Sequence, residues 1–167
     1  MDDLNLDRRM LSTLRGYGTD PRVASATRAV SWAGEHGAVW LVAGLAGAGA
    51  DRGRCGAWLR GTAVVAGAHV VSMGVKRVVR RPRPEHVVPL VRSAGRYSFP
   101  SSHATSAVAA AVAYGALGAP VMMPLAAAMC VSRLVVGVHY PSDVAAGAVL
   151  GALAARVGTR WMRGSGD

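Results

Sequence analysis

The sequence predicts an all-α integral membrane protein, a helical bundle of about five transmembrane helices that follows an N-terminal amphipathic segment. The chain has 167 residues, 51% of them hydrophobic, and five of its stretches are apolar and free of charged side chains. Few of these helices would keep a polar face for water. A soluble bundle is the alternative, because apolar runs of about 10–14 residues are often core helices. Five such runs in one short chain argue against it.

The longest apolar stretch predicts two helices. Residues 104–132 contain no Lys, Arg, Asp or Glu, and this stretch is too long for one span of about 20 residues and too short for two long spans. Within it, residues 118–120 (Gly-Ala-Pro) form a turn signal. We therefore expect two short antiparallel helices, over about 104–118 and 121–136.

Three further apolar stretches predict the remaining spans, over 37–50, 61–75 and 144–155. Small residues within them suit close contact between helices in lipid, and they also permit a homo-oligomer. These small residues are Gly44, Gly47, Gly49, Gly147 and Gly151. The tryptophans near the ends of the apolar stretches are expected to anchor the protein at the membrane interface. They are Trp32, Trp40, Trp58 and Trp161.

The first 35 residues differ from the rest of the chain. Residues 2–35 carry five acidic and five basic side chains, and leucine and methionine recur at roughly helical spacing over residues 4–14. Such a segment is expected to lie on the membrane surface, and it lacks the apolar region and cleavage site of a signal peptide. We therefore divide the chain into an interfacial segment, 1–35, and a membrane-embedded bundle, 36–167.

The chain is strongly basic, with 19 Lys and Arg against 9 Asp and Glu and a formal net charge of +10. This balance favours an anionic partner such as nucleic acid, anionic lipid or a phosphate-bearing substrate. The charges are divided between the two ends of the apolar stretches instead of forming one stripe, which argues against nucleic acid. The bilayer and a lipid phosphate are therefore the expected partners.

Polar residues gather at three places near the ends of the predicted spans, in 76–84, 99–106 and 132–143. Ionisable groups at membrane depth are costly, so each is a candidate for function. In an antiparallel bundle, the end of the second span, the start of the third and the turn between the fourth and fifth lie on one membrane face. The three clusters are therefore expected to converge on one site.

The residue types in these clusters suit phosphate. Lys76, Arg83 and Arg133 supply three positive charges, enough for a phosphate dianion and for the charge that builds during its transfer. Ser101 and Ser102 add hydroxyls at the expected start of a helix, where free backbone N–H groups also favour an anion.

Two histidines and one carboxylate can share the proton transfers of a two-step displacement. Asp143 follows His139 by four residues, and the two side chains come within reach if Pro141 begins a helix. A carboxylate on one imidazole nitrogen of His139 leaves the other as a nucleophile, while His103 serves as the second proton carrier. No metal-ligand spacing is present. The sequence thus predicts phosphoryl transfer through a phosphohistidine, without a metal or other cofactor.

Three ordered motifs, Lys-x6-Arg-Pro, Pro-Ser-x-His and Ser-Arg-x5-His-x3-Asp, resemble those of the type-2 phosphatidic acid phosphatase superfamily. They occupy residues 76–84, 100–103 and 132–143. The resemblance implies a helical bundle that hydrolyses a phosphomonoester or diphosphate, usually on a lipid, without metal. It assigns the nucleophile to His139, its partner to Asp143, the acid on the leaving oxygen to His103, and the phosphate cradle to Lys76, Arg83, Ser101 and Arg133.

One position departs from the family pattern, because Ser102 stands where the family commonly has glycine. A serine would be strained there if the backbone needed a positive φ. If the residue instead begins a helix, serine fits and adds a hydrogen-bond donor. We favour the second arrangement.

The expected substrate is a lipid whose phosphate lies at the rim of the bundle. The short chain, the early amphipathic segment and the Ser-Ser-His sequence are similar to those of small actinobacterial members of the family, some of which act on decaprenylphosphoryl-5-phosphoribose in cell-wall synthesis. A polyprenyl-linked phosphate is therefore expected, with undecaprenyl diphosphate, phosphatidylglycerophosphate and phosphatidic acid as alternatives. A non-catalytic membrane protein that binds lipid or anions would need the basic residues but not the histidines.

The charge distribution also predicts an orientation in the plasma membrane. With five spans, thirteen basic residues fall on the face of the site and six on the opposite face. The positive-inside rule then places the site of this multi-pass protein on the cytoplasmic side.

Overall fold

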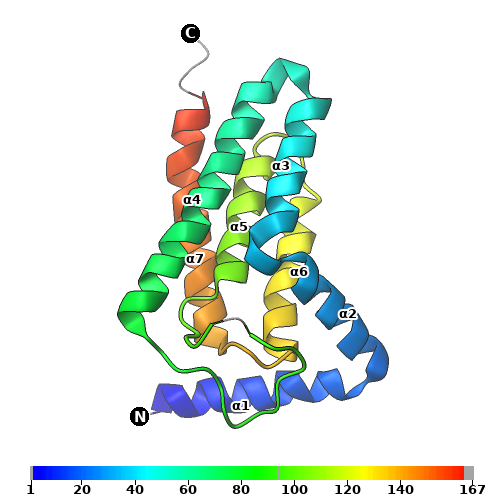
Figure 1. Ribbon diagram of the computed structural model, residues 1–167, viewed down its shortest axis with the longest axis vertical. Coiled ribbons are helices and arrows are strands. Elements are labelled where there is room, and N and C mark those ends of the chain that lie inside the picture. The colour runs from blue at the N-terminus through cyan, green and yellow to red at the C-terminus, as the bar shows by residue number, and fades with distance from the viewer. Residues whose placement is uncertain (1, 94, 164–167) are drawn as a thin grey trace.

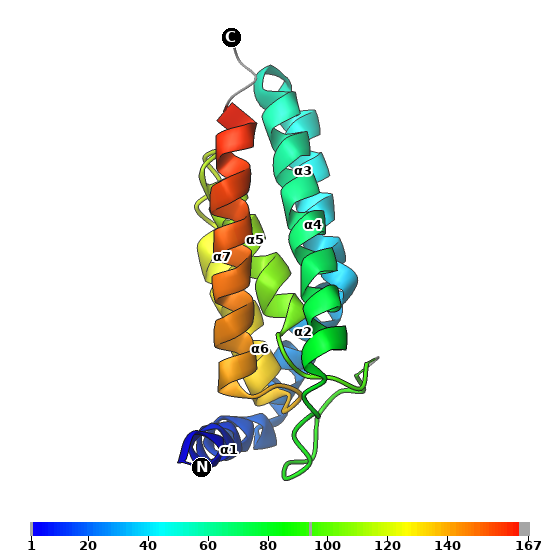
Figure 2. The same ribbon diagram turned by 90° about the vertical axis from the view of Figure 1, so that its left-hand side faces the viewer.

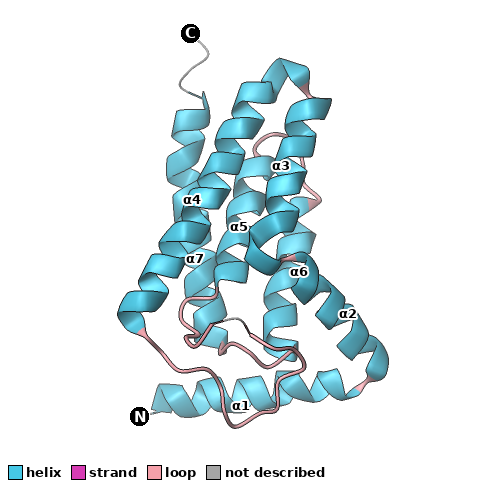
Figure 3. Ribbon diagram, viewed as in Figure 1, coloured by secondary structure: helices cyan, strands magenta, loops and turns pink. Residues whose placement is uncertain are grey.

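The computed structural model of the protein describes residues 2–93 and 95–163, with side chains described for residues 6–93 and 95–160. Five helices run side by side as a bundle, and the N-terminal helix lies across one end of it (Figure 1). The helices are α1 Asp2–Gly16, α2 Pro21–Ala33, α3 Ala38–Ala50, α4 Cys55–Val79, α5 Ser102–Gly115, α6 Met122–Val135 and α7 Pro141–Arg163, with short 3-10 turns η1 Tyr17–Thr19, η2 Glu35–Gly37 and η3 Arg52–Arg54. Over the described ranges the chain forms helices and loops without a strand (Figure 3), so the all-α prediction is confirmed.

Every apolar stretch of the sequence lies in a helix. α5 and α6 share the stretch 104–132 and are separated by a turn in which Gly118 adopts a φ of +87°. Both have 14 residues, a length of about 21 Å at about 1.5 Å per residue. α4 has 25 residues and α7 has 23, so both helices extend well beyond the charge-free stretches 61–75 and 144–155 that predicted them.

Close packing of the bundle depends on glycines that face neighbouring helices. A Cβ atom on Gly147 would lie 2.5 Å from the Ser101 carbonyl oxygen, and one on Gly151 would overlap the Thr105 carbonyl oxygen. The backbones of α5 and α7 therefore meet almost directly. The prediction of close helix contacts is confirmed at Gly147 and Gly151, whose packing partners belong to the same chain. It is wrong at Gly49, because nothing lies within 4 Å of a Cβ built there.

Two tryptophans that we expected at the membrane interface are part of the core instead. Trp40 is 3% exposed and Trp58 is 7% exposed, and the Trp58 ring lies 5.4 Å from that of Tyr114. A Cβ on Gly47 would overlap the Trp58 ring, so the absence of a side chain at position 47 leaves room for the indole. Trp32 is 78% exposed, as an anchor would be, and the side chain of Trp161 lies outside the described residues.

The outside of the bundle is rich in aliphatic side chains. Helices α3, α4, α6 and α7 carry many aliphatic residues of which more than half of the surface is exposed. These residues include Val42, Leu45, Val70, Val71, Val131, Val149, Leu153 and Val157. An apolar surface of this extent is typical of a protein that contacts lipid. By length and composition, one helix of the described chain, residues 52–79, is apolar enough to cross a membrane, and Met122–Val135 is a shorter apolar helix.

A long loop between α4 and α5 closes the end of the bundle where α1 lies (Figures 1 and 2). α4 ends at Arg80, whose backbone is left-handed, with a φ of +53°. The loop is held by the N-terminal helices: Arg15 Nε donates to the Val88 carbonyl oxygen at 2.8 Å, and Arg28 Nε to that of Leu90 at 3.2 Å. α1 and α2 thereby fix the loop that carries part of the site.

Candidate active site

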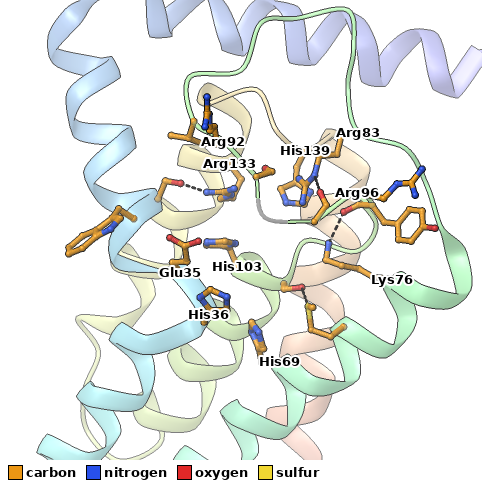
Figure 4. A pocket seen from close by; sticks show the side chains of 18 of the residues that line it. Glu35, His36, His69, Lys76, Arg83, Arg92, Arg96, His103, Arg133 and His139 are labelled. Atoms are coloured by element: carbon orange, nitrogen blue, oxygen red, sulfur yellow. Dashed lines mark hydrogen bonds between the residues drawn. The ribbon is translucent and has the colours of Figure 1, made fainter.

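A cavity of about 560 Å³ lies at the end of the bundle that the loop covers. Side chains from α2, α4, α5, α6 and the loops project toward a common space (Figure 4). Six of the eight predicted site residues line the cavity, namely Lys76, Arg83, Ser102, His103, Arg133 and His139. The other two, Ser101 and Asp143, are fully buried beside it. The three sequence clusters therefore meet at one end of the bundle, as the antiparallel arrangement predicts.

The pair His139 and Asp143 is buried at the start of α7. Pro141 is the first residue of this helix, as expected, and the helical turn places Nδ1 of His139 3.6 Å from Oδ2 of Asp143. The same carboxylate oxygen accepts a hydrogen bond from the backbone N–H of Tyr140 at 2.9 Å. Nδ1 thus faces the carboxylate, and Nε2 is the nitrogen left for chemistry.

The surroundings of His139 favour its neutral form. Burial lowers the pKa of His139 well below its usual value, and the positive charges of Arg133, Arg83 and Lys76 lower it further. A neutral imidazole carries the lone pair that a nucleophile needs. The cations that would hold a phosphate therefore also keep the predicted nucleophile unprotonated.

Backbone carbonyl groups hold two of the three predicted phosphate-binding cations in place. Lys76 Nζ donates to the carbonyl oxygens of Ser98 at 2.9 Å and Pro100 at 2.6 Å. Arg83 donates from Nε to Gly95 at 2.7 Å and from Nη1 to Val138 at 2.8 Å. These bonds fix the loop 95–100 and the turn before His139 around the same charges.

The third cation, Arg133, is 4% exposed and donates from Nη1 to the hydroxyl of Ser31 on α2. Among the described residues, no carboxylate oxygen lies within 4.0 Å of a side-chain nitrogen of Lys76, Arg83 or Arg133. Burial lowers the pKa of the Arg83 guanidinium. An arginine nevertheless stays protonated, so its charge is held in a poorly solvated place. Three desolvated positive charges without a carboxylate partner form a strong anion site.

The two serines before His103 differ in role. Ser101 is the N-cap of α5, and its hydroxyl accepts a hydrogen bond from the Ala104 N–H at 3.4 Å. Ser102 is the first residue of α5 and lines the cavity, and its φ is not positive. The prediction that Ser102 begins the helix is confirmed. The Ser101 hydroxyl only accepts in this cap and keeps its O–H as a donor, but the residue is fully buried and does not line the cavity.

His103 lies on the first turn of α5 and faces the cavity, with Arg133 and Glu35 beside it in Figure 4. His139 lines the same cavity from the turn before α7. The two imidazoles can therefore face one bound group. Within the described residues, no three His, Cys, Asp or Glu side chains are grouped so as to hold a metal ion.

Sequence reasoning missed several residues at this site. Arg81, which the sequence motifs do not single out, forms ion pairs with Asp143 at 2.9 Å and with Asp7 at 2.8 Å. Other cavity residues not predicted from the sequence are Arg28, Glu35, His36, His69, Arg92 and Arg96. The basic run 80–83 was the available signal for Arg81, but the run does not show which arginine faces inward.

Comparison with known proteins agrees with this geometry. The model of the PAP2 superfamily matches residues 57–167. A curated protein from Mycobacterium tuberculosis, named decaprenylphosphoryl-5-phosphoribose phosphatase, is 44% identical over 135 residues, which cover 79% of this chain and 76% of the relative. A protein of the same name from Mycolicibacterium smegmatis is 45% identical over 130 residues, covering 76% of this chain and 72% of the relative.

Among solved structures, the fold is similar to that of a transmembrane PAP2-type phosphatidylglycerolphosphate phosphatase from Bacillus subtilis. The TM-score is 0.61 and the sequence identity 21%, over 96% of each chain. The likeness extends to the N-terminal helices, which lie outside the matched family region. The family match, the named relatives and the shared fold lead to one conclusion: the chain belongs to the PAP2 superfamily and is a hydrolase of phosphoric monoesters.

Proposed function

We propose that this protein is a multi-pass membrane phosphatase that removes the phosphate of a polyprenyl-linked phosphosugar, decaprenylphosphoryl-5-phosphoribose. The observation that carries the proposal is the arrangement around His139, a buried imidazole that faces Asp143 and shares a cavity with the three cations Lys76, Arg83 and Arg133. The relatives named for this substrate, at 44% and 45% identity, support the choice of lipid.

The cavity suits a polar headgroup larger than phosphate. Its volume of about 560 Å³ is within the usual range for small-molecule sites. Cationic side chains gather toward His139, whereas Glu35 adds a carboxylate to the lining. A carboxylate repels phosphate but accepts hydrogen bonds from hydroxyl groups, so a phosphate carried on a sugar matches the lining better than a bare phosphate.

The reaction follows from the placement of the histidines. Nε2 of His139 attacks phosphorus, the bond from phosphorus to the sugar 5-oxygen breaks, and His103 gives that oxygen a proton. Water then attacks the phosphohistidine while His103 takes one of its protons, and the bond from phosphorus to Nε2 breaks to release inorganic phosphate. Lys76, Arg83, Arg133 and Ser102 hold the phosphate oxygens through both steps, and Ser101 assists through the N-terminus of α5.

We also propose that helices α3 to α7 cross the membrane and that residues 1–35 lie at its surface. The aliphatic exterior of these helices supports the proposal, and α1 lies across the bundle end as an interfacial helix would (Figure 2). The excess of basic residues near the site favours the cytoplasmic face. A reporter that is active only in the cytoplasm, fused after Asp167, should be inactive, because five spans place the C-terminus on the opposite face. An active reporter would overturn this orientation.

Phosphate release from a panel of lipids in detergent tests the function. The panel contains decaprenylphosphoryl-5-phosphoribose, undecaprenyl diphosphate, phosphatidylglycerophosphate and phosphatidic acid, each with excess chelator and with a His139→Ala control. We expect turnover to persist in chelator, to vanish in the variant and to be fastest with the phosphosugar lipid. Faster turnover of another lipid would overturn the substrate, and binding of lipid without any turnover would favour a non-catalytic carrier.

A further inference from the structure

Arg81 connects the catalytic pair to the N-terminal helix. Its Nη1 atom lies 2.9 Å from Oδ1 of Asp143, and its Nη2 atom lies 2.8 Å from Oδ2 of Asp7, on α1. Nη1 also donates to the Ser142 hydroxyl at 2.6 Å. The planar guanidinium lies over the Tyr140 ring, 4.1 Å from its centre. One side chain is thus fixed by four groups.

Asp7 also contacts the start of α7 directly. Its Oδ1 atom accepts a hydrogen bond from the Ser142 N–H at 3.0 Å, and its Oδ2 atom accepts one from the Ser142 hydroxyl. An acid at this place satisfies a free N–H group of the first turn and interacts favourably with the helix dipole. Asp7 therefore acts as a cap for α7, although it lies 135 residues away in sequence.

These contacts determine how the Asp143 carboxylate faces His139. Oδ1 is occupied by Arg81 and Oδ2 by the Tyr140 N–H, so the carboxylate cannot rotate freely. Oδ2 is the atom that lies nearest Nδ1 of His139. Arg81 itself does not line the cavity, and hence it is placed to act through Asp143 instead of on the substrate.

We propose that Arg81 and Asp7 are positioning residues of the phosphatase, which orient the Asp143 carboxylate toward His139 and make α1 a working part of the active site. The kinetic test of this inference rests on the proposed function, because it measures turnover. A simple basic flank would be exposed, yet the side chains of Arg81 and Asp7 are only 18% and 12% exposed. Groups that orient a metal-bound histidine from behind are typically worth about 10–100-fold in activity, and we expect a similar effect for partners that orient the carboxylate behind His139.

The kinetic test compares Arg81→Met, Arg81→Lys and Asp7→Asn with Asp51→Asn. Asp51 is a matched control, since it also pairs with an arginine, Arg54, at 2.7 Å. This pair lies in the connection between α3 and α4, which is at the end of the bundle opposite α1 (Figure 1). We expect the Arg81 and Asp7 variants to lose about 10–100-fold in kcat with KM changed less than about threefold, because the phosphate ligands remain. Arg81→Lys should not restore kcat, since one ammonium cannot bridge both carboxylates in the geometry of a guanidinium.

The Arg81–Asp7 contact itself is tested by the double variant. If Asp7 acts through Arg81, Asp7→Asn combined with Arg81→Met should be no slower than Arg81→Met alone. Additive losses would show that Asp7 acts independently and would overturn that part of the inference. If Asp51→Asn lost as much kcat and thermal stability as the Arg81 and Asp7 variants, the effect of those variants would be merely structural.

A second measurement does not depend on turnover. The pKa of His139, followed by NMR in detergent, should rise in Arg81→Met because the charge of Asp143 is no longer offset. The other groups that face His139, namely Lys76, Arg83, His103 and Arg133, are unchanged in this variant. An unchanged pKa would overturn the inference. Failure of the wild-type protein to release phosphate from any lipid would instead overturn the proposed function, while the pKa shift would still test the contact.

Discussion

The imidazole of His139 and the carboxylate of Asp143 lie 3.6 Å apart, at exposures of only 2% and 0%. They belong to one continuous stretch of chain, four residues apart, and the start of α7 at Pro141 turns one toward the other. A separation of 3.6 Å is longer than a hydrogen bond. The carboxylate thus faces Nδ1 of His139 without a hydrogen bond between the two groups.

Replacing Asp143 with asparagine should remove most of the activity without loss of substrate binding. An amide cannot stabilise the developing positive charge on His139, and in comparable pairs this loss is worth about 10⁴-fold in kcat. Kinetics and thermal unfolding of Asp143→Asn in detergent test the expectation. A variant that keeps more than a tenth of wild-type kcat would show that Asp143 is not the partner of His139.

Replacing His103 should affect substrates according to their leaving groups. A sugar alcohol needs a proton as it departs, so His103→Ala should slow lipid hydrolysis by about 10²–10⁴-fold. An aryl phosphate with an acidic leaving group needs no such help, and its first step should be nearly unaffected. Rapid-mixing kinetics should then show a burst of phenol release followed by slow turnover. Equal losses on both substrates would contradict the role of His103 as the acid.

The titration of His139 should occur below pH 6.5. Burial and the charges of Arg133, Arg83 and Lys76 disfavour the imidazolium, so the imidazole stays neutral as the pH falls through the usual range of histidine. NMR titration in detergent, with the signal assigned by its loss in His139→Gln, measures this directly. Arg133→Met should raise the pKa, because one positive charge is removed. A His139 pKa at or above 6.5 in the wild type would contradict the electrostatics described here.

Replacing Gly151 with alanine should destabilise the bundle. A Cβ at this position overlaps the backbone of α5 at Thr105, and overpacking of this kind costs about 1–3 kcal/mol. Gly49→Ala is the matched control, because nothing lies within 4 Å of a Cβ there. Thermal unfolding in detergent should separate the two variants. Equal midpoints would show that α5 and α7 are not in close contact.

The sequence was sufficient to predict the helices and the meeting of the three motifs. Charge-free stretches and one Gly-Ala-Pro turn define α5 and α6 closely, because neither a helix buried inside the bundle, such as α5, nor a helix that faces lipid can carry unpaired charges. The position of Ser102 was also predictable, since a serine pair before an apolar run is a helix start.

Contacts between distant segments could not be predicted in the same way. Asp7 lies 74 residues before Arg81, and nothing in the run 80–83 distinguishes the arginine that faces Asp143 from its neighbours. The sequence predicts Trp40 and Trp58 to be membrane anchors, yet both are buried. For Trp58 the reason is that Gly47, on the neighbouring helix, leaves room for its ring. Such pairings depend on how the helices dock.

Transfer of phosphate to His139 can be observed by trapping the phosphohistidine intermediate. The protein is mixed with substrate carrying labelled phosphate, quenched in alkali, where phosphohistidine survives, and digested for peptide mapping. We predict label on the peptide that contains His139, no label in His139→Ala, and accumulated label in His103→Ala with an aryl phosphate. Label on another residue, or full turnover by His139→Ala, would contradict the account.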